Sequence, residues 1–383
     1  MSQSSLTHRL EQGMQKRIIQ LLNKTSGLKA REIASRLGYD RKEVSQHLHE
    51  HRDIFVQDPD TFGWSVIDHA SFAMELTCNG AWLSETHFEK AMAKSGSPLD
   101  AEHGHIHIKF APERNILLCA AVKVLALANQ LVAAKKRVEL DFSENPKMLT
   151  YLDRAGFFDR LNSAVKVIPK RPANSAAQKY NGKNDGLVEF LEIHAKQNDV
   201  PDRIRHSFIE KAGAEHANKL FTVVAEFVGN VQDHSRTEIP GIAGLQCYGN
   251  GGNGKFKILA VVSDSGKGIC ATLRPGLRKY FPDIAKKFDT SVQNSDPMLI
   301  LHAVLQGGLT RKGIGRGGIG LHAGHEMGLK LSAKIKIRQE NFSVTLIYKN
   351  DAIERTSWAA NLPKLNGTHI TFEFNLDKKS ISA

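Results

Sequence analysis

Four short motifs in the C-terminal part of the chain most constrain what it can fold into. The first holds an acidic residue and an asparagine four positions apart, Glu226 and Asn230. Residues with this spacing lie on one face of an α-helix. The other three motifs are Asp264-Ser-Gly266-Lys-Gly268, the glycine-dense stretch 313–321, and Gly367-Thr368.

The glycine-dense stretch predicts a phosphate-binding loop. It reads Gly-Ile-Gly-Arg-Gly-Gly-Ile-Gly-Leu and leads into a segment that we expect to be helical. A loop of this kind at the start of a helix leaves backbone N–H groups free to bind phosphate oxygens. Asp264 follows an apolar strand expected over Lys257–Ser263, so its carboxylate should end that strand.

In this order the four motifs resemble the nucleotide-binding signature of the GHKL superfamily, which includes gyrase, heat-shock chaperones, histidine kinases and MutL. The resemblance spans roughly Glu215 to Leu376. It implies a Bergerat-type α/β sandwich over residues 215–383 that binds ATP together with Mg²⁺. Mg²⁺ prefers oxygen ligands and keeps several of its waters, which suits a carboxamide oxygen.

The same resemblance implies a role for each motif. Glu226 corresponds to the general base, Asn230 to the Mg²⁺ ligand, and Asp264 to the group that accepts a hydrogen bond from the adenine amine. A positioned general base typically contributes about 10²–10⁴ in rate. The other implied contacts to ATP are Asp233, Gly266, Gly268, Arg311, Lys312, Gly315, Gly317, Gly318, Gly320 and Thr368.

Composition argues for a cytoplasmic protein with more than one domain. The chain has 383 residues, of which 41% are hydrophobic and 24% charged, as in soluble globular proteins. Four scattered cysteines favour a reducing compartment over disulfides. The longest apolar stretch, Ile116–Ala134, contains Lys123 and so predicts a buried helix rather than a membrane span. The formal net charge of +12 suits a polyanionic partner.

Residues 1–70 resemble a winged helix-turn-helix. Helical periodicity covers Lys16–Asn23 and Lys29–Leu37, and a third helix over Asp40–Glu50 begins with an N-cap aspartate. A β-hairpin is expected in 54–67. The third helix would be the recognition helix and would contact DNA through Arg41, Lys42, Ser45, Gln46 and His49. Winged helices also serve as protein docking or dimerisation modules, so that alternative stays open.

Strands and helices alternate from about His103 to Pro169, and the strand expected over Arg137–Phe142, which ends Leu-Asp-Phe-Ser, is followed by a helix expected from Pro146 to about Ala155. On this strand and helix, residues 71–168 resemble a STAS-type α/β domain, the domain of anti-sigma-factor antagonists. The resemblance implies a protein partner for this segment. The antagonists carry an Asp followed by an acceptor Ser, where this chain has Leu149-Thr150. Because that Asp is missing, we expect Thr150 to be a surface or capping residue.

Residues 169–214 are expected to form a linker and two leading helices, over Leu187–Gln197 and Asp202–Ala212. Between Ile269 and Lys312 we expect a long basic lid that orders over ATP and forms an interface, with a homodimer as one form of it. We expect no following domain that donates a phosphate-binding lysine, so Arg311 and Lys312 are the expected cations.

Three functional classes follow from this reading. The first is an ATPase switch that couples nucleotide state to DNA or protein binding. The second is a serine/threonine protein kinase of the anti-sigma-factor type, and the third is a DNA-binding transcriptional regulator for which ATP is only a ligand. A histidine kinase is less favoured, because His206 lacks a recognisable two-helix phosphoacceptor hairpin.

Overall fold

The computed structural model describes residues 3–52, 54–59, 61–66, 71–179, 187–193, 199–212, 214–234, 237–249, 255–309 and 320–377. The fold is a mixed α/β fold with several sheets, as the sequence predicts. It divides into two compact units. The first comprises Met1–Phe72 with the short pieces Glu102–Ile106 and Lys135–Arg137, and the second holds the rest of the chain.

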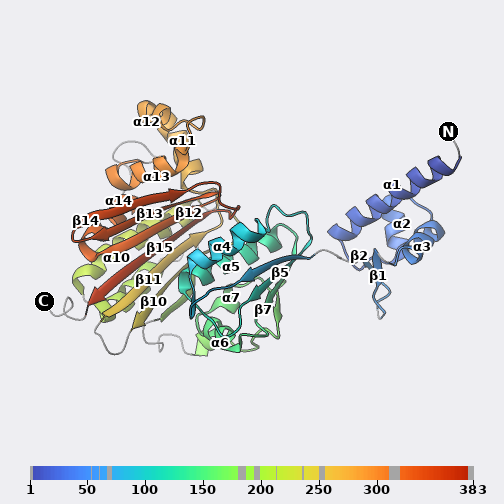
Figure 1. Cartoon of the computed structure of the whole chain (residues 1–383), viewed down its shortest axis with the longest axis horizontal. Coiled ribbons are helices and arrows are strands. Elements are labelled where there is room, and N and C mark those ends of the chain that lie inside the picture. The colour runs from blue at the N-terminus through green and yellow to red at the C-terminus, as the bar shows by residue number, and fades with distance from the viewer. Residues whose placement is uncertain are drawn as a thin grey trace. The chain divides into compact units, whose positions relative to one another are not determined.

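The first unit contains three helices and a two-stranded antiparallel sheet (Figure 1). Gly38 ends the second helix in the left-handed conformation, and Asp40 caps the third by accepting hydrogen bonds from the N–H groups of Lys42 and Glu43, as predicted. Its core includes Trp64, which is 2% exposed. The elements are α1 (Gln3–Lys24), α2 (Ala30–Leu37), α3 (Arg41–Glu50), β1 (Phe55–Gln57) and β2 (Trp64–Val66).

A four-stranded sheet with helices follows along the chain. Its strand order is β3-β5-β7-β8, and β7 and β8 are parallel. The longest helix of this segment is buried along nearly its whole length. The elements are β3 (Phe72–Leu76), β4 (Trp82–Leu83), α4 (Glu85–Ser95), β5 (His105–Phe110), β6 (Asn115–Ile116), α5 (Leu118–Ala133), β7 (Arg137–Asp141), α6 (Pro146–Arg154), α7 (Phe157–Arg160), β8 (Lys166–Ile168) and α8 (Ala176–Lys179).

The second unit is built around a seven-stranded sheet of order β14-β13-β12-β15-β11-β10-β9, in which neighbours are antiparallel. Its strands are β9 (Leu187–Ile193), β10 (Gly241–Gly249), β11 (Lys255–Asp264), β12 (Ala333–Gln339), β13 (Phe342–Lys349), β14 (Ala352–Ala359) and β15 (Thr368–Asp377).

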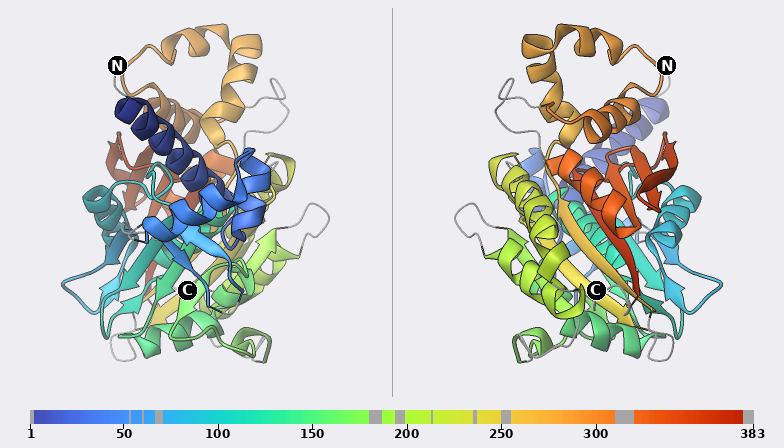
Figure 2. Two further views of the ribbon diagram at one scale, coloured as in Figure 1. Left: turned by 90° about the vertical axis from the view of Figure 1, so that its right-hand side faces the viewer. Right: turned by 90° about the vertical axis from the view of Figure 1, so that its left-hand side faces the viewer.

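Helices cover both faces of this sheet. On one face α9 (Val200–Ala212), α10 (Ala214–His234) and α14 (Gly320–Leu331) share a large apolar core with the strands (Figure 2, right). On the other face α5 packs against β10 and β11, where Gly244 lies close to the side chain of Leu118. The sheet is therefore the middle layer of three.

One expected helix is a strand. The sequence predicts a helix over Leu187–Gln197, but Leu187–Ile193 form β9, which pairs with β10 at the edge of the sheet. Leu187, Phe190 and Leu191 have helical spacing, yet both faces of this segment are buried, and a strand buried on both faces also reads as a continuous apolar run. The expected helix over Asp202–Ala212 is confirmed as part of α9.

The segment expected to be a long lid is largely helical between residues 269 and 306. It forms α11 (Ile269–Tyr280), α12 (Pro282–Lys287) and α13 (Ser295–Gln306), and α11 and α12 form an arm that projects from the sheet (Figures 1 and 2). Arg274 fixes the base of this arm, because it donates hydrogen bonds to the Phe288 carbonyl (2.6 Å) and the Ser295 hydroxyl (2.8 Å) and pairs with Asp296. None of the helices in the described part of the chain is long and apolar enough to cross a membrane.

Candidate functional site

Asp264 lies at the last position of β11, where the strand leaves the sheet. It is opposite Thr368, the first residue of β15, and the N–H of Gly266 donates a hydrogen bond of 2.6 Å to its carboxylate. Burial raises the pKa of Asp264 to about 6, against the hydrogen bonds from Gly266 and Thr368, which lower it. The side chain is half-buried, and its carboxylate is held in a fixed orientation by these hydrogen bonds while it is only partly solvated.

Gln339, the last residue of β12, links Thr368 of β15 to the first turn of α11. Its Nε2 donates to the hydroxyl of Thr368 (3.0 Å), and its Oε1 accepts from the N–H of Cys270 (3.4 Å). Gln339 and Thr368 are 2% and 6% exposed. Because Thr368 in turn donates to Asp264, the three side chains form one hydrogen-bonded chain at this end of the sheet.

The glycines of two motifs have a positive φ, and one of them also makes a close contact that excludes a side chain. Gly367 has a φ of 89°, and a Cβ there would overlap the backbone carbonyl of Asp264. Gly268 has a φ of 78° and caps α11 beside the Gln339 amide. Both are left-handed conformations that glycine adopts without strain.

Helix α10 carries Glu226 and Asn230, the first half-buried and the second exposed. The C-terminal turn of this helix lies over the same end of the sheet as Asp264. Gly241 of β10 is in contact with the Val231 side chain and also lies near the carbonyl of Ser263, so the two elements meet there. Asp233 is also within α10, but its side chain lies outside the described residues.

The glycine-dense loop is only partly within the described structure. Gly320 begins α14, which packs beside α10 and on β12 and β13. Gly328 of α14 lies directly against the Tyr348 ring. Outside the described residues lie Arg311, Lys312, Gly315, Gly317 and Gly318.

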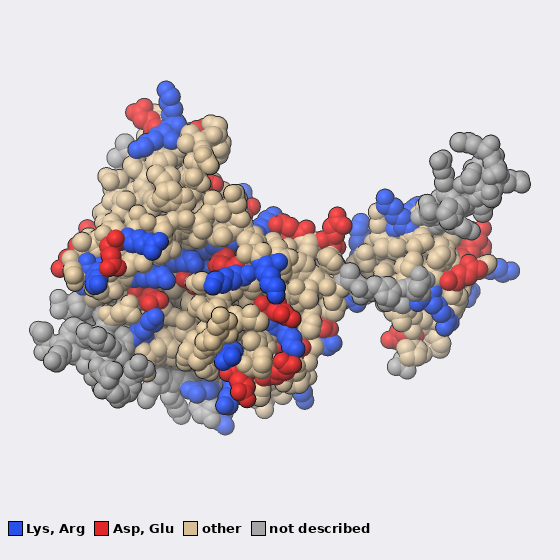
Figure 3. All heavy atoms as spheres, viewed as in Figure 1, with Lys and Arg blue, Asp and Glu red and all other residues tan. Residues whose placement is uncertain are grey.

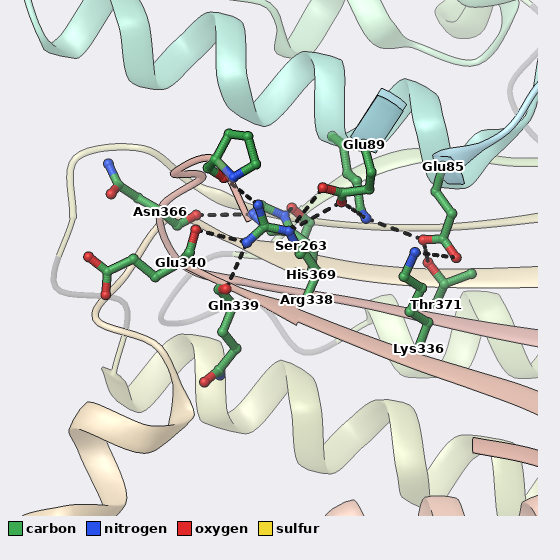
Figure 4. Close-up of polar contacts among 12 residues, drawn as sticks. Glu85, Glu89, Ser263, Lys336, Arg338, Gln339, Glu340, Asn366, His369 and Thr371 are labelled. Carbon is green, nitrogen blue, oxygen red and sulfur yellow. Dashed lines mark hydrogen bonds and ion pairs between the residues drawn. The ribbon is translucent and has the colours of Figure 1, made fainter. Parts of the chain in front are cut away.

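A second polar network lies behind the site, on the α5 side of the sheet (Figure 4). His369 links Ser263 and Asn366: its Nδ1 is 2.7 Å from the Ser263 hydroxyl and its Nε2 is 3.0 Å from the Asn366 carbonyl. Since a carbonyl can only accept, Nε2 carries the proton and Nδ1 accepts from Ser263. Burial and the nearby cations Lys123 and Arg338 lower the pKa of His369 to about 3, so the ring is neutral.

Buried charges near this group join α4 and α5 to the sheet. Lys123 of α5 pairs with Glu89 (2.8 Å) and Glu85 (3.3 Å) of α4, and Arg338 of β12 donates to Glu89 at 3.2 Å. Burial alone would raise the pKa of Glu89, but Lys123 and Arg338 hold it at about 2. Arg338 also donates to backbone carbonyls around the adjacent turn, including that of Glu340 (2.8 Å).

Sequence reasoning missed Gln339, His369 and the buried ion pairs. Gln339 precedes Glu340-Asn341, a polar pair typical of an exposed hairpin turn, and the Ser263 partner of His369 comes from a distant part of the chain. The only sequence signal was position, because His369 directly follows the Gly367-Thr368 motif.

In the first unit, Arg41, Lys42 and Gln46 are exposed on α3, and Ser45 is half-buried. His49 is exposed but packs its ring edge-on against Trp64, with centroids 4.8 Å apart. The expected contact residues thus share the accessible side of one helix.

Neither a known protein family nor a curated protein matches this chain. Within the described residues, no group of three or more His, Cys, Asp or Glu side chains could hold a metal ion. The site therefore has to be judged on its own geometry.

Proposed function

We propose that the second unit binds ATP with Mg²⁺ in a Bergerat-type site and acts as an ATPase switch. The observation that carries the proposal is the Asp264 carboxylate, which is desolvated and oriented by Gly266 and Thr368 at the end of the sheet. An ionised, poorly solvated acceptor of this kind suits the exocyclic amine of adenine, because a charge-assisted hydrogen bond contributes roughly 1.5–3 kcal/mol.

The residues on α10 fit the rest of the nucleotide. Asn230 is exposed on the helix whose end lies over Asp264, and its carboxamide oxygen would be a ligand for Mg²⁺, which would neutralise phosphate charge. Glu226 is one turn earlier on the same face and half-buried, which suits a base that orients a water. Gly320 at the start of α14 would continue the phosphate loop.

The remaining segments suggest what such a switch controls. Three helices and a β-hairpin in the first unit support the winged helix-turn-helix assignment, with DNA as partner of α3. The four-stranded sheet with α5 and α6 supports the STAS-like assignment and a protein partner. Both assignments are part of the proposal.

The test is the fate of labelled γ-phosphate when the protein is incubated with ATP and Mg²⁺. We expect free phosphate from the wild type and none from Glu226→Ala or Asp264→Asn, while Asp283→Asn, which changes an exposed carboxylate on α12, remains active. Label on protein would instead establish a kinase. Binding of ATP without hydrolysis or phosphate transfer would instead favour the third class, a regulator for which ATP is only a ligand.

A further inference from the structure

Gln130 of α5 contacts two of the motif turns at once. Its Nε2 donates to the Ser265 hydroxyl (2.9 Å) and to the Asn366 carbonyl (2.9 Å), and its Oε1 accepts from the Asn366 N–H (3.0 Å). Ser265 directly follows Asp264, and Asn366 directly precedes Gly367. One side chain from the α5 layer therefore holds both turns that flank the Asp264–Thr368 pair.

The orientation of this amide is fixed by its partners. Asn366 presents both an N–H and a carbonyl to it, so only one placement of the Gln130 oxygen and nitrogen satisfies both. Gln130 is 4% exposed, and a buried amide that lost these partners would be left without hydrogen bonds that water could not replace. The contact is thus specific in both geometry and energy.

A second path leads from the same turns to the strands. Asn366 also accepts from His369, which binds Ser263, the residue before Asp264 (Figure 4). Displacement of Asn366 would therefore disturb β11 as well as β15. The position of α5 itself is set by Lys123, which is bound to two carboxylates of α4.

We propose that Gln130 is a positioning residue for the nucleotide site, and that it makes nucleotide affinity depend on the seating of α5. This inference rests on the proposed ATP binding. Gln130 does not touch the nucleotide in this account. Gln130 fixes the distance between the two turns, so that Asp264 and Thr368 can contact the adenine base together. If binding of a partner moved α5, the two turns would lose this contact with Gln130.

The test compares Gln130→Met with Asn129→Leu. Both changes replace a buried amide by an apolar side chain of similar size, but Asn129 bonds to Arg160 and Asn162, away from the motif turns. We expect Gln130→Met to weaken binding of a fluorescent ATP analogue at least 10-fold, about 1.4 kcal/mol, and Asn129→Leu to change it less than 2-fold at a similar loss of stability. Equal affinities for the two variants would overturn the inference.

Hydrogen exchange without nucleotide gives a reading independent of the proposed function. Gln130→Met should speed exchange at the Asn366 amide at least 10-fold, and Asn129→Leu should leave it unchanged, because only Gln130 accepts from that N–H. Unchanged exchange at the Asn366 amide in Gln130→Met would contradict the role of Gln130 in holding the two turns. A wild type that is folded and protected at Asn366 but does not bind the analogue would contradict the proposed function instead.

Discussion

At the scale of single residues, the main feature is an aspartate that opposes stability at neutral pH. The raised pKa of Asp264, about 6, means that the folded protein holds a proton between about pH 4 and pH 6 that the unfolded chain has released. The stabilising contribution of this proton is fully present below about pH 4 and is lost as pH rises through 6. Such a cost is expected where a group is kept for binding.

The first prediction is that Asp264→Asn keeps or raises the stability of the protein at neutral pH although it weakens ATP binding. At pH 7.5 the variant should unfold at the same or a higher temperature than the wild type, because a neutral amide replaces a desolvated carboxylate. Its advantage should disappear at pH 4.5, where the wild-type carboxyl is protonated. Calorimetry at the two pH values measures this, and a variant destabilised at pH 7.5 would refute the account of Asp264.

The second prediction concerns His369, whose contribution to stability changes with pH in the opposite direction to that of Asp264. Its folded pKa is about 3, below that of an unfolded histidine, so its stabilising contribution is present above about pH 6.5 and is lost as pH falls toward 3. Each pH unit in that window corresponds to about 1.4 kcal/mol. The free-energy difference between wild type and His369→Gln should therefore shrink by about 2 kcal/mol between pH 6.5 and pH 5, as measured by urea unfolding. A constant difference would mean that the ring takes up its proton in the folded protein at the same pH as in the unfolded chain.

At the scale of elements, the seating of α10 depends on the absence of a side chain at Gly241. A Cβ there would overlap a methyl group of Val231, whose χ1 angle is stiff. Gly249, at the other end of the same strand, has no neighbour among the described residues within 4 Å of such an atom. The two glycines form a matched pair.

The third prediction is that Gly241→Ala destabilises the protein by about 1–3 kcal/mol and weakens ATP binding, because α10 must move. Gly249→Ala should change stability by less than about 0.5 kcal/mol. Chemical unfolding of both variants decides this. Equal effects would show that α10 does not rest on Gly241.

The fourth prediction concerns the ion pairs that hold α5. Lys123→Met leaves Glu85 and Glu89 without their shared partner and should cost about 3–5 kcal/mol. Lys166→Met removes an exposed partner of Glu139 and should leave the unfolding midpoint unchanged. A Lys123→Met protein as stable as the wild type would show that these carboxylates are solvated or protonated.

At the scale of the whole molecule, features that depend on neighbouring residues in the sequence were easier to predict than contacts between distant parts of the chain. The Asp40 cap and the strand that ends at Asp264 follow from local residue types and are confirmed. The helix predicted over Leu187–Gln197 was wrong. Leu187–Ile193 form a strand because they pair with β10, and that pairing is not visible in the local sequence. The helices after Gly268 were not predicted. Pro275 lies inside α11, where a proline is unfavourable, whereas Pro282 opens α12.

Positive charge is distributed over more than one surface of the protein. Figure 3 shows Lys and Arg side chains gathered over β12–β14 of the second unit, where Lys334 is half-buried and Arg355 exposed. The first unit has its own exposed pair, Arg41 and Lys42 on α3. The net charge of +12 therefore does not by itself identify a nucleic-acid surface.

The fifth prediction tests the surface of α3. If this helix contacts DNA, replacing Arg41 and Lys42 together by Ala should weaken duplex binding and reduce the slope of its salt dependence by about 2. The matched control replaces Lys16 and Lys24, two exposed lysines of α1. Fluorescence anisotropy at several salt concentrations measures both. Equal slopes in the two variants would exclude α3 as the DNA-binding element.

The most direct test of the central claim is calorimetric titration of Mg-ATP into the wild type and into Asp264→Asn at pH 7.5. We predict one ATP bound per chain of wild type and at least 10-fold weaker binding to the variant, with the variant still folded by its unfolding curve. Equal affinities, or no heat of binding to the folded wild type, would contradict the assignment of this site to a nucleotide.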